Sequence, residues 1–322
     1  MSPRNFLLFA CGVFVLSLTA PEGRAALQAS QIVRHPAPSG PLSARLDWAL
    51  AEAAKAAGAG KGFWIGYGIR REMGEHSQMG VNVSFSSMET SLEDRIYGRR
   101  PAAERKLSTD AGSPARPERG LEPGLGFPLE RKVVREIAVL LRFGAPNARR
   151  PRLISACTLS AGVAFEDVPL YWLGPAADDD SLHLLMAYYV PDAPAELRTA
   201  AVEVVALHRK PDLVVPFLER IVAGREPERL RADAAEYLGD QPDARALDIL
   251  KRTARADASL EVRKAAVSGL VEMELAAAFD ALVDLALHER ETKIRIEAIE
   301  ALGNFHTPAA SNALLGIIKG SK

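Results

Sequence analysis

The sequence has little cysteine, almost no net charge and no long apolar run, and each absence excludes a class of protein. Only two cysteines, Cys11 and Cys157, occur among 322 residues, which excludes a disulfide framework and a zinc site of four thiolates. The formal net charge of −1 excludes a generally basic nucleic-acid-binding protein. With 48% apolar and 25% charged residues, the composition is that of globular domains.

The charge is unevenly distributed along the chain. Residues 61–162 hold 17 basic and 11 acidic side chains, whereas residues 163–322 hold 18 basic and 27 acidic ones. A basic middle followed by an acidic C-terminal half indicates two different regions.

The N-terminus resembles a targeting segment. Arg4 precedes a run of 13 apolar or small residues from Phe6 to Leu18, which is shorter than the ~20 residues of a membrane-spanning helix. Small residues at Gly23 and Ala25 predict cleavage after Ala25, so residues 1–25 are expected to be a signal peptide. The protein is therefore predicted to be exported, either periplasmic or secreted, and the alternative is an inner-membrane anchor formed by an uncleaved signal.

The region after the signal predicts a linker and then a small α+β region. Residues 26–41 contain several Pro, Ser and Gly residues and are expected to be a linker. Residues 42–160 are expected to fold as a helix and an antiparallel sheet, with 101–130 a disordered loop because it lacks apolar periodicity. The predicted helix is 42–57, and the predicted strands are 63–69, 81–85, 133–143 and 152–159.

The C-terminal half repeats with a period of about 32 residues. Each unit contains two segments of helix length with apolar stripes, and turn residues separate them. The first segments are predicted at 195–207, 228–239, 260–272 and 292–304, and the second at 212–223, 243–254, 275–287 and 308–318. Two columns keep this phase: Leu218, Leu250, Leu282 and Leu314, and the arginines Arg198, Arg231, Arg263 and Arg295. A single helix pair of this size cannot bury its apolar face, so the pairs are expected to stack as an α-solenoid.

The repeat resembles the HEAT-repeat family, in the short bacterial form related to the phycobilisome-lyase repeats. The pattern hydrophobic-Arg-x-x-Ala-hydrophobic-x-x-Leu-Gly occurs at 230–239 and again at 294–303. The resemblance covers about residues 163–322 and implies protein–protein scaffolding more often than catalysis. The whole arrangement is similar to exported bacterial HEAT-repeat proteins of unassigned role. Residues 194–322 are expected to be the regular solenoid, and 161–193 a degenerate first repeat that caps it.

No pattern indicates catalysis, a metal or a cofactor. One His-Glu pair, His288-Glu289, occurs in the repeats, whereas iron ligation in a related hydroxylase uses several. The run Asp178 to Asp180 lacks the alternation of a calcium loop and is expected to be the acidic first turn of a helix. We therefore expect a non-enzymatic protein with no catalytic, cofactor-binding or metal-binding residues.

Two sets of charged residues are candidates for interaction. The arginine column is interpreted as a stacking ladder between repeats, since only the stack needs one arginine in every unit. The polar face of the second helices is the candidate surface for a partner, because second helices usually line the concave surface of a solenoid. Its predicted contact residues are Arg220, Asp248, Arg252, Asp280 and Asp284.

The leading functional hypothesis is a non-catalytic scaffold that holds a protein partner on the concave surface in an extracytoplasmic compartment. The sequence gives no identity for this partner, and nucleic acid is not expected. The alternative is a ligand-binding protein or enzyme with a site between the N-terminal sheet and the first repeat, around Trp64, Cys157 and Trp172.

Overall fold

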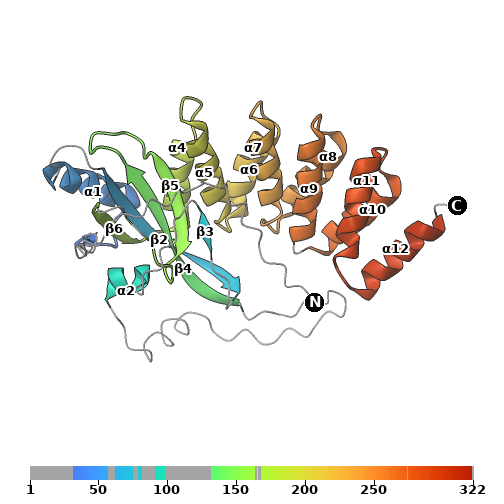
Figure 1. Ribbon diagram of the computed structural model, residues 1–322, viewed down its shortest axis with the longest axis horizontal. Helices are drawn as coiled ribbons and strands as arrows, with labels where there is room; N and C mark the ends of the chain where they lie inside the picture. The colour runs from blue at the N-terminus through green and yellow to red at the C-terminus, as the bar shows by residue number, and fades with distance from the viewer. Residues whose placement is uncertain are drawn as a thin grey trace, which may run out of the picture.

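Figure 1 shows a computed structural model of the chain, with a sheet at one end and a row of helices extending from it. The structure describes residues 32–56, 62–74, 79–81, 91–98, 132–163, 165, 168–273 and 275–320. The predicted signal peptide at 1–25 and the predicted loop at 101–130 lie outside the described residues. No helix in the described ranges has both the length and the apolar character needed to cross a membrane.

Within the described residues the sheet has six strands, in the order β1-β6-β2-β4-β5-β3. The strands are β1 (Ile32–Arg34), β2 (Phe63–Gly74), β3 (Gly80–Val81), β4 (Lys132–Phe143), β5 (Leu153–Thr158) and β6 (Leu170–Pro175). Strands β2, β4, β5 and β3 pair antiparallel, as predicted. The sheet as a whole is mixed, however, because β6 runs parallel to both β2 and β1.

Two segments of the sheet differ from the sequence prediction. Residues 32–34 belong to the segment predicted as a linker, yet they form β1, because β6 offers a free edge with which they pair in parallel. Leu170–Pro175 lies within 161–193, the segment predicted as a degenerate first repeat, and it forms strand β6 instead of a helix. Its apolar and aromatic side chains suit a strand that is buried on both faces.

The sheet has a separate apolar core on each face. Alternate residues of β2, namely Phe63, Ile65, Tyr67 and Ile69, join the main core with helix α1 (Leu42–Ala56) and the solenoid. Trp64 points to the opposite face and belongs to a smaller core beneath helix α2 (Leu92–Tyr97). The sheet is therefore the N-terminal cover of the solenoid.

The solenoid has the helix pairs that the 32-residue period predicts. Its helices are α4 (Asp178–Tyr188), α5 (Ala195–Ala206), α6 (Pro211–Val222), α7 (Glu228–Leu238), α8 (Ala244–Ala256), α9 (Leu260–Glu272), α10 (Ala276–His288), α11 (Thr292–Gly303) and α12 (Pro308–Gly320). Every predicted segment agrees with an observed helix to within two residues at each end. Helix α4 is the second helix of the degenerate unit, and β6 stands where the first helix of that unit was expected.

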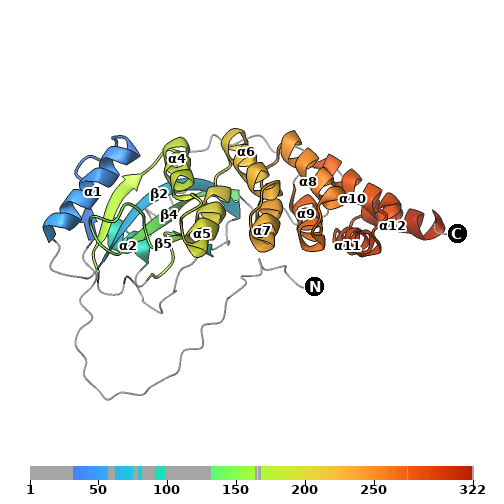
Figure 2. The ribbon, with the colours of Figure 1, turned by 90° about the horizontal axis from the view of Figure 1, so that it is seen from above.

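The helices form two layers that are packed unequally (Figure 2). We call α5, α7, α9 and α11 the inner layer, and α4, α6, α8, α10 and α12 the outer layer. Helix α9 contacts its inner-layer neighbours α7 and α11 much more extensively than α10 contacts its outer-layer neighbours α8 and α12. The stack therefore bends toward the inner layer. The prediction that the second helices line the concave surface is wrong, because they form the outer layer.

Helices α7 and α9 of the inner layer approach each other closely at two glycines, Gly239 and Gly269. A Cβ atom on Gly239, at the end of α7, would lie 2.3 Å from the carbonyl oxygen of Gly269 in α9. A Cβ atom on Gly303, at the equivalent place two units later, would have no atom within 4 Å. The tight spacing of α7 and α9 thus depends on the missing side chain at Gly239.

We expect Gly239→Ala to destabilise the protein by about 1–3 kcal/mol, because α7 and α9 must move apart to admit the methyl group. Gly303→Ala is the matched control and should be neutral or slightly stabilising, since alanine favours the helix and the space is open. Urea unfolding of both variants measures the difference. Equal stability of the two variants would contradict the close packing of the inner layer.

Candidate protein-binding surface

The arginine column forms a ladder along the solenoid. Arg263 donates from Nε to the carbonyl oxygen of Ala254 (2.8 Å) and from Nη2 to Oε1 of Glu289 (3.0 Å). Arg231 repeats both contacts one unit earlier, with the carbonyl of Val222 and the carboxylate of Asp257.

The two ends of the ladder use parts of the same pattern. Arg198 donates to Glu226 (2.8 Å), and Arg295 donates to the carbonyl oxygen of Glu289 (2.9 Å). Each arginine thus joins its own helix to a turn or helix end of a neighbouring segment. These are the contacts expected of stacking residues.

The joint between sheet and solenoid contains a buried chain of hydrogen bonds. Nδ1 of His208 donates to the carbonyl oxygen of Val204 (3.1 Å), so Nε2 of the neutral ring accepts from the Ser181 hydroxyl (2.9 Å). Ser181 in turn accepts from the Tyr67 hydroxyl (3.0 Å). Burial lowers the pKa of His208 and keeps the ring neutral. Ser181 and Tyr67 have no exposed surface, and His208 has almost none, so this network connects β2 to α4 and the turn after α5 rather than serving a substrate.

The residues named for the alternative site do not line this joint. Trp64, Cys157 and Trp172 lie on the far face of the sheet, within the smaller apolar core. Trp64 packs edge-on against Phe165 at a ring distance of 5.8 Å. Burial raises the pKa of the Cys157 thiol to about 12, so it is not a reactive thiolate at neutral pH. The prediction of a site between sheet and first repeat around these three residues is therefore wrong.

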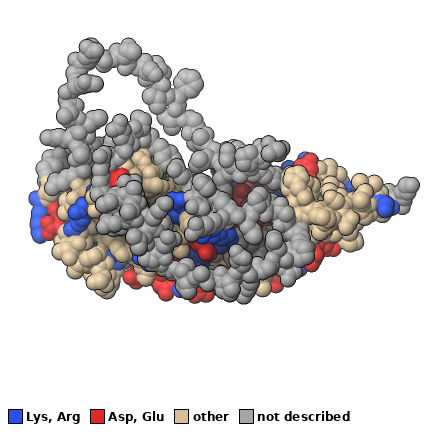
Figure 3. All heavy atoms as spheres, turned by 90° about the horizontal axis from the view of Figure 1, so that it is seen from below, with Lys and Arg blue, Asp and Glu red and all other residues tan. Residues whose placement is uncertain are grey.

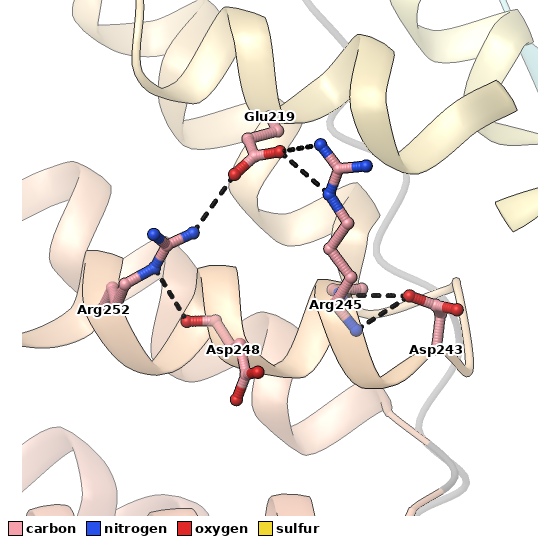
Figure 4. A network of polar contacts seen from close by, with 6 residues as sticks. Glu219, Asp243, Arg245, Asp248 and Arg252 are labelled. Carbon is pink, nitrogen blue, oxygen red and sulfur yellow. Dashed lines mark hydrogen bonds and ion pairs between the residues drawn. The ribbon is translucent and has the colours of Figure 1, made fainter. Parts of the chain in front are cut away.

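The predicted contact residues lie on the outer layer and are partly engaged with one another (Figure 4). Glu219 of α6 accepts from Arg245 (2.5 Å) and from Arg252 (3.1 Å), both of α8. The guanidinium of Arg252 also lies 3.4 Å from the carbonyl oxygen of Asp248. The face thus brings opposite charges of adjacent units together.

The other members of the predicted set are spread along the same layer. Asp284 of α10 accepts from Arg255 and lies 2.9 Å from Nδ1 of His288. Arg220 lies over the ring of Phe217, with its guanidinium carbon 5.8 Å from the ring centroid. Asp280 is exposed on α10. Of these five residues, Arg252 and Asp284 have ion-pair partners in the described part of the chain, and the face as a whole carries charges of both signs.

The inner layer carries acidic side chains that the sequence analysis did not select. Glu203 of α5 and Asp233 of α7 are half-buried, and burial together with the Asp233 charge raises the pKa of Glu203 to about 7. Burial also raises the pKa of Asp233, although Arg229 opposes this effect. Glu236 is exposed, yet desolvation by the surrounding protein and the charges of Asp233 and Glu272 raise its pKa as well.

These three carboxylates form what we call the inner acidic cluster: Glu203, Asp233 and Glu236. None of them has an ion pair elsewhere in the described part of the chain, in contrast to the outer layer. Glu203 and Glu236 occupy equivalent positions in adjacent units, so the sequence contained a signal for this cluster. The signal was missed because the second helices, and not the first, were expected to line the concave surface. No group of three or more His, Cys, Asp or Glu side chains within the described ranges is placed to hold a metal ion.

The fold and these surfaces define a helical-repeat protein with a bent stack and two differently charged layers. The HEAT-repeat family profile matches residues 182–271 and 252–322, so the C-terminal part of the chain is a HEAT-repeat domain. Among solved structures, the complex of CpcE and CpcF of phycocyanin lyase from Nostoc sp. PCC7120 is similar, with 23% identity and a TM-score of 0.33. That similarity covers 44% of this chain and 87% of the other. No curated protein sequence matches this chain.

We expect Arg263→Met to destabilise the protein by about 3 kcal/mol, because it leaves the carboxylate of Glu289 largely buried and unpaired. The double variant Arg263→Met/Glu289→Gln should recover part of that loss. Arg255→Met is the matched control, since its pair with Asp284 is exposed and should contribute less than about 1 kcal/mol. Urea unfolding tests the order, and equal losses for Arg263→Met and Arg255→Met would contradict the ladder.

We expect Glu203→Gln to stabilise the protein at neutral pH by about 1–3 kcal/mol and to leave it unchanged near pH 4. The folded-state pKa of about 7 lies above the ordinary value of 4.5, so the folded protein binds the proton more tightly. The parent should therefore lose stability as the pH rises from about 4.5 to 7, and the variant should lose less. Asp248→Asn is the exposed control, and a parallel pH profile for Glu203→Gln and the parent would contradict the assignment.

Proposed function

We propose that this protein is a non-catalytic scaffold that acts outside the cytoplasm and holds a cationic segment of a partner protein on the inner layer of its solenoid. HEAT repeats support the general role, because stacked helix pairs provide an extended concave surface for protein partners. The observation that supports a cationic partner on the inner layer is the inner acidic cluster, whose carboxylates have raised pKa values.

The charges of the inner layer favour a basic partner. Carboxylates with raised pKa values are in an environment that disfavours their ionised form, and a nearby lysine or arginine would reverse this. Glu203, Asp233 and Glu236 come from two adjacent inner-layer helices, so one extended segment crossing α5 and α7 could contact all three. Charge complementarity of this kind gives specificity and a fast encounter.

The location outside the cytoplasm rests on the N-terminal sequence. Arg4, the apolar run that follows and the small residues at Gly23 and Ala25 have the order of a secretory signal. Cys157 is buried, so the folded protein is compatible with an oxidising compartment.

The test is crosslinking capture of the tagged protein from its native host, with fractionation before recovery. The inner variant Glu203→Gln/Asp233→Asn/Glu236→Gln should lose a specific basic protein by about tenfold or more, because the loss of a few charge pairs is worth over 1.4 kcal/mol. Quantitative mass spectrometry measures recovery relative to the parent.

The matched control reverses the charges that were first expected to bind: Arg220→Glu, Asp248→Lys, Arg252→Glu, Asp280→Lys and Asp284→Lys. This outer variant should keep the partner. Loss of the partner with the outer variant alone would overturn the assignment to the inner layer, and recovery of the protein only from the cytoplasm would overturn the assignment of its location.

A further inference from the structure

The outer layer contains a pocket between α4 and α6, near the C-terminal ends of both helices. These helices are neighbours in the layer (Figure 2), yet they contact each other less than any later pair of adjacent outer-layer helices does. The space between them is a pocket with a volume of about 300 Å³. Its lining comes from α4, from α6 and from the turn after α6, and includes Met186, Tyr189, Phe217, Arg220, Ile221 and Glu226.

Four of the lining side chains are apolar or aromatic. The rings of Tyr189 and Phe217 pack edge-on, with their centroids 5.3 Å apart, and Met186 and Ile221 lie beside them. An apolar cavity of about 150 Å³ is large enough for benzene. The pocket therefore has room for an apolar group of that size together with a small polar group.

Arg220 is a cation without an ion-pair partner in the described part of the chain. It is exposed, and its guanidinium carbon lies 5.8 Å from the centroid of the Phe217 ring in the same pocket. Arg252 occupies the equivalent position one unit later and donates to Glu219 of the preceding outer-layer helix (3.1 Å). The residue 32 positions before Glu219 is Ala187, so Arg220 lacks the carboxylate that Arg252 has.

The other charges at the pocket compensate each other. Glu226 accepts from Arg198 (2.8 Å), and the guanidinium carbon of Arg198 lies 5.9 Å from the centroid of the Tyr189 ring. Burial and the charge of Glu226 raise the pKa of Tyr189, so its hydroxyl stays neutral. Arg220 therefore gives the pocket a net charge of one positive unit.

The local charge of Arg220, and not a broad positive surface, would attract an anion here. Charges of both signs are interspersed on the described surface, as Figure 3 shows for one side and the ion pairs of Glu219 show for the outer layer. A guanidinium binds a carboxylate through two parallel hydrogen bonds. One positive charge matches a carboxylate better than a phosphate monoester, which carries nearly two negative charges at pH 7.

We propose that the pocket between α4 and α6 binds a carboxylate that adjoins an aromatic or aliphatic group, with this group in the cavity and the carboxylate on Arg220. Two sources have this chemistry, namely a small free acid and the C-terminal residue of a polypeptide. The pocket shares no residue with the inner acidic cluster, so it is independent of the proposed cationic partner.

Ligand-detected NMR titration of the mature chain tests the pocket with three probes. They are 3-phenylpropanoate, the tripeptide acetyl-Gly-Gly-Phe with a free C-terminal carboxylate, and the same tripeptide as its C-terminal amide. We expect the better of the two acids to bind with a dissociation constant of about 1 mM or lower, and the amide to bind at least about tenfold more weakly.

The two acids distinguish the two sources. Tighter binding of the tripeptide acid would assign the pocket to a chain terminus, and tighter binding of 3-phenylpropanoate would assign it to a free acid. An amide that binds as tightly as the better acid, or the absence of binding by both acids, would overturn the proposal.

Variants at two positions test the assignment to Arg220. Arg220→Met should weaken binding of the better acid by at least about tenfold, whereas Arg252→Met should bind like the parent, because Arg252 already bonds Glu219. Ala187→Glu should also weaken binding, since it gives Arg220 the carboxylate that the repeat has one unit later, and Ala187→Gln is its neutral control. Parental affinity in Arg220→Met, or an equal loss in the two control variants, would overturn the site.

Discussion

The register of the solenoid depends on one repeated interaction, the bonding of an arginine near the start of an inner-layer helix to a backbone carbonyl and a carboxylate of neighbouring segments. At Arg263 the carbonyl is that of Ala254 and the carboxylate is that of Glu289. A guanidinium has donors on both Nε and Nη2, so it can make both bonds at once, which a lysine cannot do with the same geometry. The apolar columns provide most of the favourable burial, but they are small and similar from unit to unit, and alanine is common among them. The arginine ladder fixes the orientation and the register of each helix pair against the next, which such a uniform apolar surface does not do.

The ladder and the close contact of the inner-layer helices together give the stack its bend, and the bend concentrates negative charge. The carboxylates of Glu203, Asp233 and Glu236 share a partly desolvated surface on the inner layer. The outer layer behaves differently, because Glu219 and Asp284 there have arginine partners in adjacent helices. The free protein thus retains an unfavourable electrostatic arrangement on the inner layer, as binding surfaces often do. The sheet closes the N-terminal end of the stack, through contacts of α5 with β5 and the hydrogen bond between Tyr67 and Ser181.

The sequence predicted the solenoid well because a 32-residue period is a local signal that each unit repeats. Helix positions from Ala195 onward agree with the structure, and the HEAT-repeat family profile confirms their class. The wrong predictions concern features that depend on contacts between residues far apart in the sequence. Leu170 to Pro175 has the residues of either a buried strand or a buried helix, and its parallel pairing with β2 decided the outcome. The direction of the bend was also missed, since periodicity identifies two faces without saying which helices pack more closely. Gly239 was read only as part of a motif, although its missing side chain permits the close approach of α7 and α9.

The central claim is that the inner layer, rather than the outer layer, holds a basic partner. Site-specific photocrosslinking in the native host tests it most directly, with a photoreactive residue at Ser268 of α9 or at Asp248 of α8. Ser268 follows Glu236 by 32 residues on the inner layer, and Asp248 is exposed on the outer layer. The account predicts a covalent adduct with one basic protein from Ser268 and none from Asp248. An adduct formed from Asp248 and absent from Ser268 would contradict it.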